Sequence, residues 1–224
     1  MAGEGALYLK KTWICDYHDV FTGGGRRIKQ VRIVLASGSP RRKELLGQIG
    51  FDFQVNLSDV DENCGISVPE LLVEELSAKK AMAVYELLKD GAEPFIVIGA
   101  DTVVSCDGKI LGKPKDDRSA KEMLGKISGR THEVYTGVTL IRSMGSGSKC
   151  EVKTFHEMTK VKFVQMTDAE IDEYVAGGDC MDKAGAYGIQ GFCARYISGI
   201  EGDYNNVVGL PVCALYSKIK EWIK

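Results

Sequence analysis

The segment covering residues 31–50 constrains the fold more than any other part of the chain. Residues 33–36 form a short apolar run typical of a buried strand, and Ser37 and Gly38 form a tight turn after it. Ser39 suits the N-cap of a following helix, and Pro40 suits its first position, where an N–H would lack a partner. A strand that leads directly into a capped helix predicts an α/β protein.

Two adjacent arginines, Arg41 and Arg42, lie in the first turn of this predicted helix. A capping box would place Glu or Gln where Arg42 stands, and the helix dipole disfavours a cation there unless an anion is bound. Free N–H groups, the hydroxyls of Ser37 and Ser39 and two guanidinium groups would suit a phosphate chain. The alternative is a pair of solvated arginines, since neither the dinucleotide fingerprint nor the P-loop spacing is present.

Composition is that of an ordinary globular protein. The 224 residues are 44% hydrophobic and 27% charged, with a formal net charge of -2. This balance argues against a nucleic-acid-binding surface but is compatible with a small phosphorylated ligand. A chain of this length buries roughly 70% of its unfolded surface, in one large domain or two lobes, and can enclose a cleft.

The cysteines and the termini predict a cytoplasmic protein without a membrane partner. No C-x-x-C pair occurs, so reduced thiols are a simpler interpretation than a structural zinc site. No apolar run reaches the length of a membrane span, and residues 1–17 do not resemble a secretory signal. We predict that residues 1–30 are an appendage, either a targeting extension, a packing arm or a disordered segment, and that residues 31–224 form the domain. The seven cysteines are Cys15, Cys64, Cys106, Cys150, Cys180, Cys193 and Cys213.

An acidic loop and a helix carrying lysines follow the first βα unit. Residues 51–55 alternate like a strand, and the next loop contains Asp61 and Glu62. A helix should begin at Pro69, with Lys79 and Lys80 at the edge of its apolar stripe. Lys79 is expected on a solvated face, whereas Lys80 fits a solvated or a functional position equally well.

The central strand, residues 95–104, is an apolar run interrupted by the single carboxylate of Asp101. A buried aspartate without a partner is costly, so we expect Asp101 at a cleft, beside a metal or a water that it activates. The alternative is a bend in which the carboxylate bonds nearby backbone. Asp107 and Gly108 should then form a hairpin turn that returns Lys113 to the same cleft.

The remaining third of the chain predicts alternating helices, strands and one ligand-facing loop. Asp116 or Asp117 should cap a helix, and a capping box at residues 167–170 should open another. Strands are expected at residues 133–141, 153–164 and 195–200, and a helix after Pro211. The glycine-rich residues 182–191 should face a ligand. An anion site with nearby carboxylates supplies the parts for metal-assisted phosphoryl chemistry.

Six short motifs occur in order along the chain. They are residues 36–42 (ASGSPRR), 98–103 (IGADTV), 112–114 (GKP), 128–132 (SGRTH), 181–191 (MDKAGAYGIQG) and 207–211 (VVGLP). Taken together, these motifs resemble the Maf family of nucleoside triphosphate pyrophosphatases. The resemblance implies a two-lobed α/β fold with a long bent mixed sheet, flanked by helices around a central cleft, related to the inosine triphosphate pyrophosphatases and forming a homodimer. It also implies hydrolysis between the α and β phosphates with Mg²⁺ or Mn²⁺.

The same resemblance implies roles for individual residues. Asp101 matches the proton acceptor and, with Glu62, the metal site. Residues that match the branch acting on dTTP and UTP are Arg41, Thr102 and Gln190; the branch acting on 7-methyl-GTP has Gln after the catalytic Asp. Further positions around the phosphates are Ser37, Ser39, Arg42, Lys80 and Lys113.

The sequence therefore predicts a pyrophosphatase that removes dTTP, UTP and modified pyrimidine triphosphates from the nucleotide pool. An alternative is a non-enzymatic nucleotide-sensing regulator of cell division, because the family is also associated with septum formation. An RNA-binding module is disfavoured by the charge balance.

Overall fold

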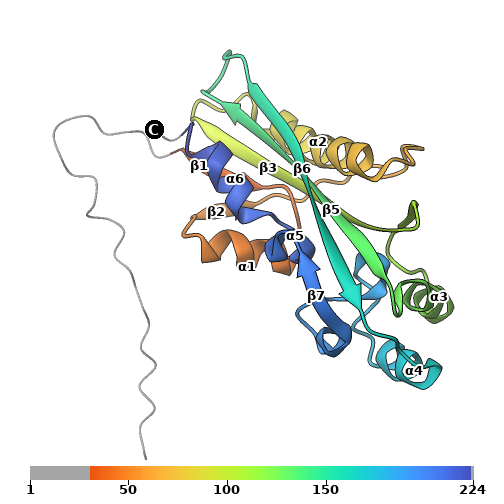
Figure 1. Ribbon diagram of the computed structural model, residues 1–224. Helices are drawn as coiled ribbons and strands as arrows, with labels where there is room; N and C mark the ends of the chain where they lie inside the picture. Colours follow the sequence, from red (N-terminus) through yellow and green to blue (C-terminus); the bar gives the residue numbers. More distant parts are fainter. Residues whose placement is uncertain (1–30, 223–224) are drawn as a thin grey trace, which may run out of the picture. The chain divides into compact units, whose positions relative to one another are not determined.

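The structure, a computed structural model, describes residues 31–222 (Figure 1). The predicted appendage at residues 1–30 lies outside the described residues, so its boundary with the domain stays a prediction. The described part is an α/β fold with a mixed sheet and flanking helices, which confirms the predicted fold class.

Seven strands form one sheet in the order β2-β1-β3-β5-β6-β7, with β4 paired to β3. β1 runs parallel to both β2 and β3, while the pairs from β3 through β5 and β6 to β7 are antiparallel. The three longest strands, β3, β5 and β6, form the body of the sheet in Figure 1. The strands are β1 (Arg32–Leu35), β2 (Phe53–Val55), β3 (Phe95–Cys106), β4 (Lys109–Leu111), β5 (Thr131–Ser143), β6 (Glu151–Phe163) and β7 (Ile197–Glu201).

Helices cover the sheet in three groups. Apolar residues of β1 and β3 alternate, so that Ile96 and Ile98 pack with α1, α5 and α6, while Phe95 and Val97 pack with α2 on the other face. A separate apolar cluster joins the far halves of β3, β5 and β6 to α3, α4 and two 3₁₀ helices. The apolar core therefore consists of three clusters, and the two-lobed division stays a prediction. The helices are α1 (Pro40–Gln48), α2 (Pro69–Leu88), α3 (Asp117–Ile127), α4 (Asp168–Ala176), η1 (Ala184–Ala186), η2 (Phe192–Tyr196), α5 (Tyr204–Val208) and α6 (Val212–Ile219).

Helix α2 lies unusually close to the sheet because two strand residues facing it are glycines. A Cβ atom at Gly99 would lie 2.3 Å from the carbonyl oxygen of Ser77, and one at Gly137 would lie 2.2 Å from that of Val73. Beside this contact the Ser77 hydroxyl lies 2.9 Å from the hydroxyl of Thr139. The register of α2 against β3 and β5 is therefore fixed by backbone contact, which positions the side chains along this helix.

Several local predictions are confirmed and a few are wrong. Pro69 opens α2, and Asp116 caps α3. Ser39 occupies the N-cap position of α1, but its side chain makes no capping bond; its N–H instead donates to Ser37 Oγ at 3.3 Å. Arg195 belongs to η2, and β7 begins two residues later, because the 3₁₀ turns persist up to Tyr196.

The helix α5 (Tyr204–Val208) was not predicted. It has five residues, which is too short to show helical periodicity, and Asp203 caps it by accepting a hydrogen bond from Asn205 N. Asn206 is fully buried and donates from Nδ2 to the carbonyl of Val134. The segment is thus attached to the sheet by buried polar contacts.

Candidate active site

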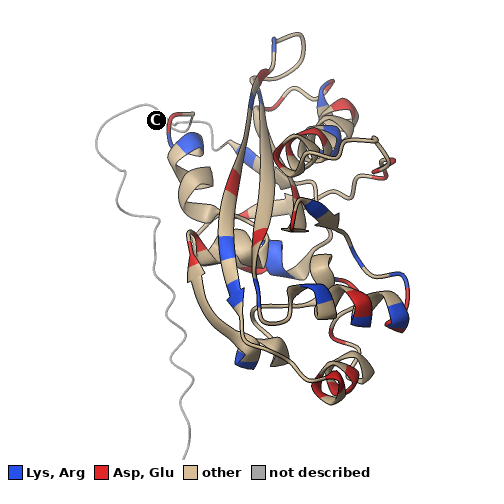
Figure 2. Cartoon of the chain, turned by 45° about the vertical axis from the view of Figure 1, so that its right-hand side comes forward, with Lys and Arg blue, Asp and Glu red and all other residues tan. Residues whose placement is uncertain are grey.

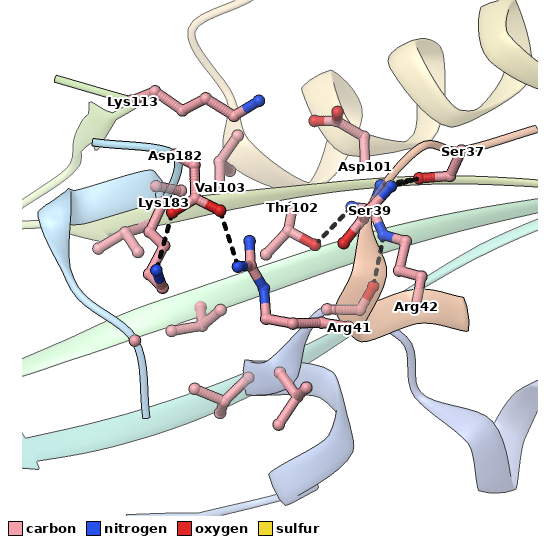
Figure 3. A pocket seen from close by; sticks show the side chains of 18 of the residues that line it. Ser37, Ser39, Arg41, Arg42, Asp101, Thr102, Val103, Lys113, Asp182 and Lys183 are labelled. Carbon is pink, nitrogen blue, oxygen red and sulfur yellow. Dashed lines mark hydrogen bonds and ion pairs between the residues drawn. The ribbon is translucent and has the colours of Figure 1, made fainter. Parts of the chain in front are cut away.

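One cavity of about 820 Å³ lies along the sheet (Figure 3). Its size is within the range of small-molecule sites. All ten residues predicted for the site line it: Ser37, Ser39, Arg41, Arg42, Glu62, Lys80, Asp101, Thr102, Lys113 and Gln190. Segments far apart in sequence therefore meet here, at the carboxyl end of β1 and the middle of β3.

Arg42 is held by three separate parts of the chain. Its Nε donates to the carbonyl of Gly209 at 2.8 Å, Nη1 to Ser37 Oγ at 3.1 Å and Nη2 to Thr102 Oγ1 at 3.0 Å. Desolvation lowers the pKa of the guanidinium from its ordinary value. Because all three acceptors are neutral, its positive charge is not paired by direct contact and is available to an anion, and the alternative of two solvated arginines is wrong.

Asp101 lies inside the straight strand β3, opposite Gly137 of β5, so the alternative of a backbone-bonded bend is wrong. Its side chain is only 11% exposed, and its Oδ1 accepts a 2.6 Å hydrogen bond from Lys80 Nζ. We expected a metal or an activated water beside this carboxylate, and in this structure the partner is the ammonium of Lys80. The pairing compensates the charge of a nearly buried carboxylate.

Lys80 forms ion pairs with two carboxylates, that of Asp101 and that of Glu62. Its Nζ lies 2.7 Å from Glu62 Oε1, in the acidic loop between β2 and α2. The hydrogen bond from Lys80 is the main cause that holds the pKa of Glu62 below its usual value; the charges of Lys113 and Arg42 act in the same direction. Figure 3 shows Lys113, two residues after the end of β4, extending toward the side of the cavity where Asp101 lies. Lys80 lines the cavity and its side chain is only 13% exposed, so it does not lie on a solvated face.

The opposite wall of the cavity contains ionic contacts of Arg41 that the sequence did not predict. Arg41 Nη1 donates to Asp182 Oδ2 at 2.9 Å, and Lys183 Nζ donates to Asp182 Oδ1 at 2.7 Å and to Asp179 Oδ1 at 2.9 Å. Partial burial works against ionisation of Asp182, but the hydrogen bonds from Lys183 and Arg41 outweigh it and lower its pKa to about 2. The glycine-rich composition of residues 182–191 predicts a ligand-facing loop, but it does not predict the ion pairs of Asp182 with Arg41 and Lys183 or of Lys183 with Asp179.

The two ends of the cavity differ in charge. Three cations, Arg42, Lys80 and Lys113, lie with the two carboxylates of Glu62 and Asp101, which leaves a positive excess. At the other end two cations balance two carboxylates. In the described part of the chain, basic and acidic residues are interspersed on α2 and α3, whereas the charged residues of α4 are all acidic (Figure 2). The positive end of the cavity is therefore a local feature suited to a phosphorylated group.

The donor set near Lys80 fits a hard divalent cation. Glu62 and Asp101 each place an oxygen within 2.7 Å of one nitrogen atom, so two carboxylate oxygens converge on one point. Mg²⁺ is commonly held by one or two carboxylates together with substrate phosphates, without a complete protein cage. Residues 31–222 contain no group of three or more His, Cys, Asp or Glu side chains placed to hold a metal.

The fold and the cavity define an α/β protein with a site for a phosphorylated ligand beside paired carboxylates. The chain belongs to the Maf family: the family model described as Maf-like protein matches residues 32–222. This confirms the resemblance seen in the sequence motifs. Within the described residues, no helix is both long and apolar enough to cross a membrane.

Curated relatives match over most of their length. A protein of Lachnoclostridium phytofermentans named dTTP/UTP pyrophosphatase is 48% identical over 191 residues, covering 85% of this chain and 95% of the relative. One of Bacillus thuringiensis with the same name is 47% identical over 192 residues, with the same coverage.

Solved structures give more distant matches. The Staphylococcus aureus Ham1 protein aligns with a TM-score of 0.38 and 18% identity, over 59% of this chain and 71% of that one. A dITP/XTP pyrophosphatase of Mycobacterium abscessus aligns with a TM-score of 0.38 and 13% identity, over 61% and 76%.

Proposed function

We propose that the protein hydrolyses dTTP, UTP and modified pyrimidine triphosphates to the monophosphate and pyrophosphate, as part of nucleotide pool housekeeping. The observation that carries this proposal is the convergence of Asp101 with Arg42, Lys80 and Lys113 at the positive end of one cavity. The names of relatives at 47% and 48% identity support the substrate class.

At the positive end, we assign the phosphates to Arg42, Lys113 and the turn carrying Ser37 and Ser39. The guanidinium of Arg42 is already oriented by three hydrogen bonds, so little of its freedom is lost when an anion binds. The lysine ammonium groups act as point charges that offset charge on the leaving pyrophosphate.

Asp101 accepts a proton from the attacking water in this assignment. A positioned carboxylate base contributes roughly 10²–10⁴ in rate, and Lys80 holds its Oδ1 in place. Glu62 and Asp101 would hold Mg²⁺ or Mn²⁺, which when bound polarises phosphate oxygens as a Lewis acid. Lys80 then has a second role, since its ammonium keeps the two carboxylates together when the cation is absent.

The base lies at the charge-balanced end in this assignment, near Arg41, Thr102 and Gln190. Thr102 lines the cavity, and its hydroxyl accepts from Arg42 Nη2 at 3.0 Å and lies 2.9 Å from the hydroxyl of the buried Thr136. Thr102 thus contacts the arginine that we assign to the phosphates.

The direct test is hydrolysis by the purified full-length chain. Incubation with dTTP or UTP and Mg²⁺ should yield the monophosphate and pyrophosphate in equal amounts, measured by anion-exchange chromatography. Release of single phosphate ions instead would place the cleavage at the terminal bond. The absence of dTMP and pyrophosphate with every triphosphate and metal tried would disprove the proposal and favour a nucleotide-sensing regulator.

We further propose a cytoplasmic homodimer, on the basis of the family resemblance and the thiol composition. Analytical ultracentrifugation of the purified chain should give about twice the mass of 24.5 kDa. A sedimentation coefficient of a monomer at micromolar concentration would contradict the dimer, and cell fractionation tests the location.

A further inference from the structure

We propose that Asp182 is a positioning residue that holds Arg41 against the base of the substrate and so determines which base is accepted. The inference rests on the proposed function, because it concerns discrimination among nucleotides in the same cavity. It is carried by a continuous set of contacts from α1 to the loop that contains Gln190.

The first contact joins parts of the chain 141 residues apart. Arg41 lies in the first turn of α1, and Asp182 lies two residues before the start of η1. Arg41 donates from Nη1 to Asp182 Oδ2 at 2.9 Å (Figure 3). The Arg41 side chain is 27% exposed and that of Asp182 is 59% exposed. An ion pair as exposed as this contributes little to stability, so an effect of Asp182 on substrate choice can be separated from an effect on folding.

Lys183 extends the contact into the protein. It donates to Asp182 Oδ1 at 2.7 Å, to Asp179 Oδ1 at 2.9 Å and to the carbonyl oxygen of Asp179. Its side chain is only 14% exposed. The nearly buried ammonium of Lys183 therefore fixes Asp182 through Oδ1. The other carboxylate oxygen, Oδ2, accepts from Arg41, and this contact defines the direction of the Arg41 guanidinium.

The same cluster supports the loop that reaches Gln190. Tyr174 donates from its hydroxyl to Asp179 Oδ2 at 3.2 Å, and the hydroxyl accepts from Gly188 N at 3.3 Å. Gly188 packs against Lys183, where an added Cβ would lie 2.6 Å from Cε. Arg41 and the residues that follow Gly188 are thus positioned by one set of contacts, and form one wall of the cavity.

The balanced charges of this wall of the cavity suit the base of the nucleotide and not its phosphates. Arg41 and Lys183 are matched by Asp179 and Asp182, so the cluster offers no net attraction to a triphosphate, unlike the other end of the cavity. An arginine that uses Nη1 for a carboxylate keeps the N–H groups of Nε and Nη2 as donors. Donors of fixed direction suit the carbonyl oxygens of uracil and thymine and oppose the 4-amino group of cytosine.

Loss of Asp182 would release Arg41 toward the phosphates, because the triphosphate would then be its nearest anion. The chemistry at Asp101 lies at the other end of the cavity and should be preserved. Binding of UTP should weaken while turnover stays similar, and discrimination against CTP should fall, because the donors that oppose its amino group are no longer held.

The test compares steady-state hydrolysis of UTP and CTP by the wild-type chain and by Asp182→Asn and Asp182→Ala. We expect KM for UTP to rise about tenfold and kcat to change less than about twofold, with a smaller UTP to CTP ratio of kcat/KM. The matched control is Asp172→Asn, which disrupts the exposed 2.7 Å pair of Asp172 with Lys121 outside the cavity and should leave both nucleotides unaffected.

A double-mutant cycle separates positioning from a direct role. If Asp182 acts through Arg41, Asp182→Ala should have no further effect on the UTP to CTP ratio in an Arg41→Ala background. Additive effects, or an equal loss of kcat for both nucleotides, would overturn the inference. If the wild-type chain hydrolyses no triphosphate, the proposed function fails. The role of Asp182 is then tested by calorimetric binding of the α,β-methylene analogues of UTP and CTP. An affinity ratio that is unchanged in Asp182→Ala would overturn this role.

Discussion

Lys80 on α2 and Asp101 on β3 meet across the helix–sheet interface, with Nζ 2.6 Å from Oδ1. Both side chains are less than 15% exposed, at 13% and 11%, so neither charge has free access to water. A charge this poorly solvated is tolerated only with a partner, and removal of one partner leaves the other uncompensated. The Lys80–Asp101 pair therefore holds the proposed catalytic carboxylate in place and also stabilises the central strand β3.

Asp101→Asn should lower kcat by at least about 10²-fold while dTTP still binds. The amide has nearly the same shape but cannot accept a proton from water, whereas the cations at the positive end remain. Calorimetry with α,β-methylene dTTP would measure binding separately from turnover. Loss of binding equal to the loss of turnover would identify Asp101 as a metal anchor instead of a base.

Lys80→Met should destabilise the protein by about 3 kcal/mol, because the carboxylates of Asp101 and Glu62 would lose their shared partner. Urea denaturation at pH 7 measures this change. Lys79→Met is the matched control: Lys79 is adjacent, 35% exposed, and its contact with Glu75 is 3.8 Å long. The control should change the free energy of unfolding by less than about 0.5 kcal/mol, and equal effects of the two would contradict a special role for Lys80.

Arg42→Ala and Arg41→Ala should impair activity in different ways. Arg42 lies at the positive end, so its removal should reduce kcat/KM by a similar factor, about 10²-fold, for dTTP, UTP, CTP and GTP. Arg41 lies at the balanced end, so its removal should change the ratios among the four substrates. A substrate profile of both variants measures this, and identical profiles would contradict the assignment of the two ends.

Gly137→Ala should lower stability by about 2–3 kcal/mol and reduce turnover, because its Cβ would overlap the backbone at Val73 and displace α2 together with Lys80. Thermal denaturation and dTTP hydrolysis measure the two effects. Gly199→Ala serves as the control, since Gly199 also lies in a strand but has no atom within 4 Å of the added Cβ. A stable and active Gly137→Ala variant would show that α2 can move freely.

His132 should make stability fall on acidification. It is 1% exposed, and burial lowers its pKa from 6.5 to about 4. The unfolded chain therefore takes up a proton at a higher pH than the folded chain, and stability is lost as the pH falls from about 6.5 toward 4, by about 3 kcal/mol in total. Urea denaturation of wild type and His132→Phe across this window should show a smaller pH slope in the variant; parallel slopes would rule out His132 as the cause.

The parts of the site that the residue pattern predicted without the family resemblance are those marked by a local conflict. Arg42 stands where a helix start favours an acid, and Asp101 interrupts an apolar strand, so each is anomalous within a few residues of sequence. The packing of α1 and β3 explains both, since each side chain turns toward the cavity. Such conflicts are informative because a chain seldom retains them without a compensating contact.

The features that the residue pattern alone did not predict depend on long-range contacts. Lys80 was predicted at the site only by the family resemblance, because periodicity could not distinguish its interior contact with Asp101 from a solvated position. Asp182 meets Arg41 across 141 residues, a pairing with no local pattern. The short helix α5 is likewise held by tertiary contacts of Asn206, not by its own propensity.

The hydrogen bond from Arg42 to the carbonyl of Gly209 also has a consequence for synthesis. Arg42 and its acceptor are 167 residues apart in the sequence. During translation the guanidinium of Arg42 therefore lacks this contact until Gly209 has left the ribosome. A product terminated before residue 209 would lack one of the three contacts that orient Arg42.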